Sequence, residues 1–555
     1  MNGAILVFGG LILFILAYRF YAAFLSEKIF DLGSISHPTP AVELEDGIDY
    51  SPSSKGVLFG HHFSSIAGAA PIVGPAVAVI WGWAPALLWI IVGVIFMGAA
   101  HDFGVLVISM KNKGKSIAEV AEKFLGRRIK ILLLSTIFFL VWMVIAVFTL
   151  IIANLFISFP SSVIPVNFEI IVALIFGTFI NKKGISLTIP SIIAQVLLFL
   201  MIYIGTIYPV SLDGVVGKDN VLMTWMVFLL IYSFVASVLP VWLLLQPRDY
   251  INCHQLFLGL GLMTIGVFVV SPKTVAPAFN LTPVGAPPWF PFLFITIACG
   301  AISGFHGLVS GGTTSKQVQR WKDAKPIGYG SMLGEGLLAL LATVAVSTGF
   351  SSAADWHHHY ANWNAANGLS AKINAFVLGA GGFLNGLGIS SHISQTVIAV
   401  LIISFAATSL DTACRIQRYI ISEIGESFSI SFLKNRFSSS AIAVISAFFL
   451  MISGDGGKGG LKLWPLFGAA NQMLASLSLL VLSVYLIRAK KNAKVFLIPA
   501  LIIIIITTLA LILNLINFYQ GNNYFLAVLA VILIGIEILV VVEGIKNLYS
   551  STNIE

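Results

Sequence analysis

The segment "LFGHHFSSIAGAAPIVGPAV", residues 58–77, is apolar enough for a membrane helix, yet its composition argues against a continuous one. Around two histidines and two serines it contains residues that interrupt helices, namely Gly60 before them and Gly68, Pro71, Gly74 and Pro75 after them. Proline removes a backbone hydrogen bond, glycine is a weak helix former, and unpaired backbone groups are costly in lipid. The segment therefore predicts a membrane span that is broken within the bilayer.

The composition around this segment is that of a membrane protein. The chain has 555 residues, of which 58% are hydrophobic and 10% charged, whereas soluble domains carry about 25% charged residues. We predict an all-α polytopic membrane protein that forms one transmembrane domain over residues 1–555. The net charge of +8 fits basic inner loops, so we expect no nucleic-acid partner. Residues 3–25 lack the features of a signal peptide, which indicates a first, peripheral span.

Apolar runs of spanning length predict about fifteen helices, within a range of about fourteen to sixteen, and the last two of them lie within 494–546. Basic segments should lie in the cytoplasm: 111–130, 181–184, 246–250, 315–325, 414–436 and 488–494. This pattern holds throughout only if 371–390, which contains the glycine-rich "LGAGGFLNGLG", is re-entrant or lies at the surface. The N-terminus is then external and the C-terminus cytoplasmic.

A second span, 291–315, is interrupted in a similar way. It includes most of "ACGAISGFHGLVSGGTTSKQ", residues 298–317, where glycine again precedes a histidine and small and hydroxyl residues follow. Loop charges make this span and the first broken span, 57–80, run in opposite directions. Inverted repeats that each contribute a discontinuous helix are typical of secondary transporters. The alternative is that the small residues only allow close helix packing.

Ionisable residues inside spans mark functional sites by default, and histidine titrates near neutrality. The candidates for carrying a coupling proton are His61, His62, Asp102, His306, Glu335 and Asp411. Asp411 also stands four residues before Arg415, a spacing that suits an ion pair along one helix.

Substrate is expected to meet the free backbone groups and polar side chains at the two breaks. The candidates are Gly60, His61, His62, Ser64, Ser65, Gly68, Ser303, Gly304, His306, Gly311, Thr313, Thr314, Asn471 and Gln472. The last two can hydrogen-bond a substrate without the penalty of a full charge, or they can hold helices together.

Imidazole and carboxylate groups also suit metal ions, which makes His61, His62, Asp102 and His306 weak candidate ligands. No ligand spacing supports a metal site, so we expect no cofactor beyond a coupling proton. The sequence has neither a P-loop nor a catalytic constellation, and we expect no enzyme. A membrane sensor that binds the same ligand without moving it is the alternative. The sequence carries no signal of oligomeric state.

Five long segments resemble the carbon starvation protein A family of transporters, in the family's order: "TPAVELEDGIDYSPSSKGVLFGHHFSSIAGAAPIVGPA" (39–76), "IACGAISGFHGLVSGGTTSKQ" (297–317), "YGSMLGEGLLAL" (329–340), "SLDTACR" (409–415) and "LWPLFGAANQMLA" (463–475). The resemblance implies a transporter in the cytoplasmic membrane of a prokaryote that imports peptides or small carboxylates such as pyruvate, with proton coupling. It also implies kinship with the amino acid–polyamine–cation transporters, whose core is a five-plus-five inverted repeat.

Two positions depart from the family's pattern. His101 precedes Asp102 where the family has a Gln-Asp or similar pair, which adds a titratable group beside the acid. "SLDTACR" differs from the family's "TVDAGTR" but keeps Asp411 and Arg415. The resulting hypothesis is a proton-coupled symporter that works by alternating access on a small-molecule substrate in a lipid bilayer. Sodium-dependent or metal-dependent transport is its alternative.

Overall fold

The computed structural model describes residues 1–183, 188–454 and 459–552, and the regular elements in these ranges are helices. The first half contains α1 (Gly3–Leu16), α2 (Ala22–Phe24), α3 (Pro40–Glu43), α4 (Lys55–Ile66), α5 (Ala70–Ala78), α6 (Trp83–Gly93), α7 (Ala99–Lys111), α8 (Ile117–Leu125), α9 (Arg127–Ser158), α10 (Val163–Lys183), α11 (Thr188–Ile207), α12 (Asp213–Val216), α13 (Val221–Val238) and α14 (Leu245–Val270).

The second half contains α15 (Trp289–Thr296), α16 (Gly304–Gly312), α17 (Ser331–Thr348), α18 (Ala353–His359), α19 (Trp363–Asn367), α20 (Leu369–Asn385), α21 (Ser391–Ser427), α22 (Ser431–Lys434), α23 (Arg436–Ile452), α24 (Gly459–Arg488), α25 (Lys494–Gln520) and α26 (Tyr524–Thr552). The predicted all-α class is confirmed.

Within the described residues, twelve helices are long and apolar enough to cross a membrane, or up to thirteen if a bent pair counts as one span. This confirms a polytopic membrane protein. Two further predicted spans, 291–315 and the apolar run 437–453, contain helices that fall short of that length or apolarity, and so does 371–390, which is expected to be re-entrant or to lie at the surface. The expected total of about fifteen crossings therefore stays a prediction.

Both broken spans are interrupted where the sequence predicts. Helices α4 and α5 are bent by 42° at residues 67–69, and α15 is separated from α16 by the non-helical stretch 297–303. Because α4 packs on α16 while α5 packs on α15, the two spans run antiparallel, as the loop charges predict. At Gly74 an added Cβ would lie 2.5 Å from the carbonyl oxygen of Thr296, so only glycine allows α5 this close to α15. The five-plus-five repeat itself stays a prediction.

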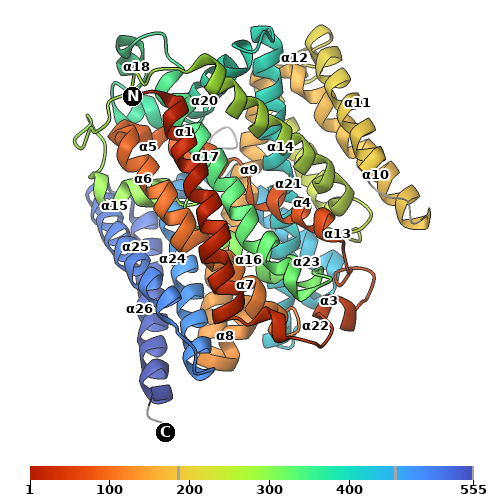
Figure 1. The fold of residues 1–555 in the computed structure, drawn as a ribbon, viewed down its shortest axis with the longest axis vertical. Helices are drawn as coiled ribbons and strands as arrows, with labels where there is room; N and C mark the ends of the chain where they lie inside the picture. The colour runs from red at the N-terminus through yellow and green to blue at the C-terminus, as the bar shows by residue number, and fades with distance from the viewer. Residues whose placement is uncertain (184–187, 455–458, 553–555) are drawn as a thin grey trace.

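The remaining helices surround the two broken spans (Figure 1). The long helix α21 is buried and packs on α9, α13 and α23, while α14 packs on α4. Helix α1 lies against α17, and the pairs α10–α11 and α25–α26 flank opposite sides of the molecule. Helix α20 packs on α5, α14, α17 and α21, so it belongs to the helical core rather than to the surface. Whether residues 371–390 are re-entrant stays a prediction.

The basic segments gather at one end of the molecule. Figure 1 shows the start of α1 and the helix α18 at one end, and α3, α8 and α22 at the other, where α26 also terminates. Helix α8 lies within the basic segment 111–130, and α22 lies within 414–436. This arrangement agrees with an external N-terminus and a cytoplasmic C-terminus, an orientation that stays a prediction.

Candidate functional site

Four buried ionisable side chains meet where α7, α16 and α17 come together, and we call His101, Asp102, His306 and Glu335 the His306 centre. The Nδ1 atom of His306 lies 3.1 Å from Oδ2 of Asp102, and its Nε2 atom lies 3.2 Å from Oε2 of Glu335. All three side chains are fully buried. Because α16 begins at Gly304, it holds His306 in its first turn, between the carboxylates of two neighbouring helices.

His101, within this centre, and His62, close to it, also face polar partners. The Nδ1 atom of His101 lies 2.8 Å from Oδ1 of Asp102, and Nδ1 of His62 lies 2.8 Å from Oγ1 of Thr314. Among the described residues, the Nε2 atoms of His62 and His101 have no hydrogen-bond partner. The structure thus brings Asp102, His306 and Glu335 together as one cluster, although their part in proton transfer stays a prediction.

A second buried cluster, the Arg248 cluster, joins four helices through Glu169, Tyr232, Arg248 and Asp411. The guanidinium of Arg248 is paired with the Asp411 carboxylate and donates a hydrogen bond of 2.8 Å to the Tyr232 hydroxyl. That hydroxyl donates in turn to Oδ2 of Asp411, at 2.8 Å. The Nε atom of Arg248 also lies 3.5 Å from Oε1 of Glu169. The single positive charge of Arg248 therefore lies between two carboxyl groups inside the protein.

The predicted cytoplasmic loop at 246–250 is wrong. Helix α14 begins at Leu245, and Arg248 and Asp249 in its first turns are each only 1% exposed. Asp249 pairs with His61 of α4. The positive-inside rule predicts a loop here because it counts only Lys and Arg and ignores the adjacent Asp249. An arginine next to an aspartate between two apolar runs was the sequence signal that these charges could be buried with partners.

The predicted alternative of an ion pair between Asp411 and Arg415 is also wrong. Asp411 pairs with Arg248, whereas Arg415 pairs with Asp49, with 3.1 Å between Nη1 and Oδ1. Since α21 is buried among other helices, its charged side chains find partners on neighbouring segments instead of along its own surface.

Asp49 lies in the loop before α4 and anchors it to α21. Its Oδ1 atom accepts hydrogen bonds from Arg415 at 3.1 Å, Arg418 at 2.9 Å and the Tyr419 hydroxyl at 2.7 Å. Burial by itself disfavours the charged carboxylate, but Arg418, Arg415 and Lys316 outweigh burial and lower the pKa of Asp49 to about 2. We call Asp49 with Arg415, Arg418 and Tyr419 the Asp49 latch.

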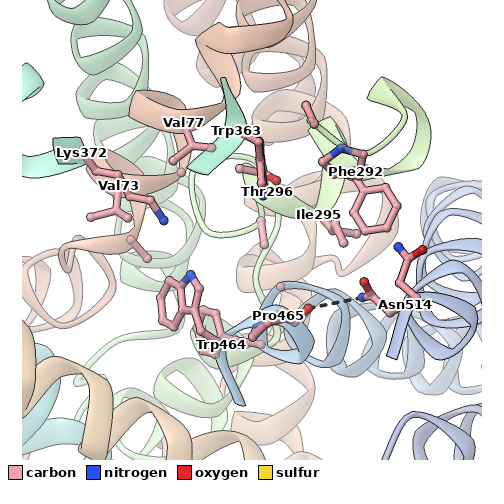
Figure 2. Close-up of a pocket in the computed structure, with 18 of the residues that line it drawn as sticks. Val73, Val77, Phe292, Ile295, Thr296, Trp363, Lys372, Trp464, Pro465 and Asn514 are labelled. Atoms are coloured by element: carbon pink, nitrogen blue, oxygen red, sulfur yellow. Dashed lines mark hydrogen bonds between the residues drawn. The ribbon is translucent and has the colours of Figure 1, made fainter. Parts of the chain in front are cut away.

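A cavity of about 580 Å³ opens over the two helix breaks (Figure 2). Ala70, at the start of α5, and Ala298 and Cys299, in the stretch between α15 and α16, lie in its wall. Its other lining residues come mainly from α5, α15, α19, α20, α24 and α25. The start of α5, just after the first break, and two residues of the second break therefore face one space that is large enough for a small organic ligand.

A short polar path leads from this cavity toward the His306 centre. The side-chain amide of Asn471 donates to Sγ of Cys299 at 3.3 Å and to Oγ of Ser303 at 3.0 Å. Its carbonyl oxygen accepts the backbone N–H of Phe305 at 2.9 Å, which caps the first turn of α16. Asn471 therefore connects the cavity wall to the half-helix that holds His306.

The other predicted site residues take part mainly in contacts between or within helices. Ser64 donates to the carbonyl of Asp249 at 3.1 Å, and Ser65 lies 3.0 Å from the Thr412 hydroxyl. The remaining polar ones satisfy backbone groups: Thr313 donates to Val309 at 3.0 Å and Gln472 to Phe294 at 2.9 Å. None of the predicted substrate-binding residues is among the described residues that line the cavity.

The predicted site glycines are packed against neighbouring side chains or backbone. An added Cβ would lie 3.1 Å from Cys253 at Gly60, 2.7 Å from Ser409 at Gly68, 2.5 Å from Asn471 at Gly304 and 3.4 Å from Val105 at Gly311. These contacts fit the alternative of close helix packing at these positions. A role in binding substrate stays a prediction.

The weak candidate metal ligands divide between two environments, because His61 pairs with Asp249 while Asp102 lies beside His306. Within the part of the chain that the structure describes, no group of three or more His, Cys, Asp or Glu side chains is arranged to hold a metal ion.

Fold and site together define a class: an all-α polytopic membrane protein built on two antiparallel broken spans, an arrangement typical of secondary transporters. The chain belongs to the carbon starvation protein CstA family, whose sequence model matches residues 2–510. This confirms the resemblance seen in the motifs and makes the chain a membrane transporter.

Relatives of known name match over most of their length. The peptide transporter CstA of Bacillus subtilis is 34% identical over 517 residues, which cover 87% of this chain and 85% of that protein. The pyruvate/proton symporter BtsT of Escherichia coli is 33% identical over 600 residues, which cover 92% and 82%. Among solved structures, a manganese transporter of Eremococcus coleocola aligns with 92% of this chain, and the alignment covers 99% of that transporter's chain. The sequence identity is 13% and the TM-score is 0.45.

Proposed function

We propose that this chain is a proton-coupled symporter that imports a peptide or a small carboxylate across the cytoplasmic membrane by alternating access. The observation that carries the proposal is His306, held between Asp102 and Glu335 and joined through Asn471 to the wall of the cavity. The names of relatives that carry peptides, or pyruvate with a proton, support the same class of substrate and coupling.

The geometry suits a proton that moves together with a helix. With imidazolium and both carboxylates charged, the three groups His306, Asp102 and Glu335 carry one net negative charge. One further proton makes them neutral, and a neutral group is much less costly to move through a low-dielectric core. Because α16 is a short half-helix packed on α7, and its His306 also approaches Glu335 of α17, a change in its tilt alters both distances to His306 at once. Proton loading thereby favours the conformational change.

One end of the molecule has an open cavity and the other has a fastened loop, and this difference supports alternating access. The cavity is lined in part by Trp363 of α19, which is close in sequence to α18 at the first end. The loop before α4 is fastened by the Asp49 latch near the basic segments at the other end. We propose that substrate enters from the α18 side and leaves after the latch has opened.

Uptake into liposomes tests the proposal. Purified protein is reconstituted and given labelled pyruvate or a labelled dipeptide, with or without an inside-alkaline pH gradient. We expect accumulation that depends on the gradient, and its loss in Asp102→Asn and His306→Gln with substrate binding retained. Asp219→Asn, an exposed acid, is the matched control. Accumulation that ignores the pH gradient, or that follows a sodium gradient instead, contradicts proton coupling.

A further inference from the structure

Lys372 of α20 is the one charged side chain among the described residues that line the cavity. It is only 5% exposed, and within the described part of the chain its ammonium group has no hydrogen bond or ion pair. Figure 2 shows Lys372 beside Val73, reaching into the cavity. No sequence pattern marks Lys372 as a site residue, because a lone lysine near the start of a glycine-rich helix gives no local signal.

An unpaired ammonium group is costly to hold away from water, and lysine is almost never this buried unless it is paired. The described lining contains no aspartate or glutamate that would compensate Lys372. Helix α5 begins on the same lining at Ala70, and the N-terminal end of a helix carries partial positive charge. The cavity is therefore electropositive, and its missing counter-charge suits an anionic ligand.

The other lining residues indicate what the uncharged part of that ligand is like. Aromatic side chains form much of it, including Phe292, Trp363 and Trp464, and Asn514 and Asn517 add amide groups. A volume of about 580 Å³ lies within the usual range of small-molecule sites, about 300–1,000 Å³. One cation among apolar walls and amides fits an organic carboxylate better than an inorganic cation.

We infer that Lys372 binds the carboxylate group of the transported substrate in the cavity over the two helix breaks. The inference deepens the proposed function. It rests on that function for the statement that the bound carboxylate belongs to the transported substrate. The carboxylate is supplied either by a small acid such as pyruvate or by the C-terminus of a peptide. In both cases the ammonium forms the ion pair and the apolar part of the substrate rests on the aromatic walls.

Binding to the purified full-length protein tests the inference without a proton gradient. Calorimetric titrations use four probes: pyruvate, its uncharged amide, a dipeptide, and the same dipeptide with an amidated C-terminus. We expect the acids to bind and the matching amides to bind far more weakly. Lys372→Gln should weaken binding of the acid about 10- to 100-fold, the range for a lost charge-assisted hydrogen bond. Lys372→Arg should keep most of the affinity.

Stability distinguishes a binding lysine from a structural one. Because Lys372 has no partner to lose, Lys372→Gln should leave the unfolding temperature of the ligand-free protein unchanged or raise it. Lys273→Gln, an exposed lysine outside the cavity lining, should change neither binding nor stability.

The possible outcomes separate this inference from the proposed function. Three outcomes overturn the inference that Lys372 binds the substrate carboxylate. They are an unchanged affinity in Lys372→Gln, equal binding of the acids and their amides, and binding of neither acid. Acid binding that depends on Lys372, without gradient-driven accumulation in liposomes, supports this role and contradicts proton-coupled transport. Preference for pyruvate or for the dipeptide identifies which source of carboxylate the cavity accepts.

Discussion

At the scale of single residues, Arg248 shows how charges are kept inside this protein. Its guanidinium lies between Asp411 and Glu169, and the Tyr232 hydroxyl completes the arrangement. Removal of one partner from a buried ionic group leaves the others uncompensated, which costs more than the intact pair contributes. The cluster therefore fixes how α10, α13, α14 and α21 sit against each other.

Replacing Arg248 should reveal this dependence. We expect Arg248→Gln to lower the free energy of unfolding by about 3–5 kcal/mol, because two carboxylates then face each other without a cation. Thermal unfolding in detergent measures the change, and the exposed Arg128→Gln is the control. Adding Asp411→Asn to Arg248→Gln should recover part of the loss. An unchanged unfolding temperature in the single variant contradicts the prediction.

The Asp49 latch should respond to acid. Its folded pKa of about 2 lies below the ordinary aspartate value of about 3.9, so its stabilising effect is complete above about pH 5 and is lost progressively as the pH falls toward 2. We expect Asp49→Asn to lower the unfolding temperature at pH 7, where it costs about 2 kcal/mol.

Unfolding temperatures of the wild type and Asp49→Asn, recorded from pH 7 down to pH 3, check this prediction. The two curves should stay parallel above about pH 5 and converge below it. A gap that narrows already between pH 7 and pH 5 would mean that another group is responsible.

At the scale of elements, the two broken spans work as a pair. Helix α5 touches α15 and α4 touches α16, so Ala70, just after the first break, and Ala298 and Cys299, within the second, line one cavity. Neither break would be tolerable in contact with lipid, because its free backbone groups need partners. Asn471 supplies such a partner at Phe305.

The close approach of α5 and α15 gives a test at this scale. We expect Gly74→Ala to reduce stability by about 1–3 kcal/mol and to impair uptake, since its Cβ would meet the Thr296 carbonyl oxygen. Gly9→Ala in α1 is the matched control, because nothing lies within 4 Å of its added Cβ. Full uptake by Gly74→Ala would show that these helices are not constrained there.

At the scale of the whole molecule, charge and shape point to one orientation in the membrane. Helices α8 and α22, which lie within the basic segments 111–130 and 414–436, are at the end opposite the start of α1, and α26 terminates at that same end (Figure 1). Lys and Arg concentrate on the cytoplasmic side of membrane proteins. The two termini should therefore lie on opposite sides, which requires an odd number of crossings.

Tags at the two termini check the orientation. In intact cells a membrane-impermeant label should reach a tag before Met1 and should not reach a tag after Glu555 until the membrane is permeabilised. Labelling of both tags, or of neither, in intact cells contradicts an odd number of crossings.

The sequence by itself determined the membrane class, the helical fold and the positions of both breaks. These are local properties, since hydropathy acts over one helix length and glycine or proline acts on its own backbone. It also marked Asp102, His306 and Glu335 as candidate site residues, because ionisable residues within apolar runs are rare.

Only the tertiary structure decided which of these side chains meet. That Arg248 pairs with Asp411 rather than lying in a loop, that His306 stands between two carboxylates, and that Lys372 faces a cavity all depend on how separate helices rotate and pack. Residues far apart in the chain become neighbours through that packing, and no local pattern of sequence contains it.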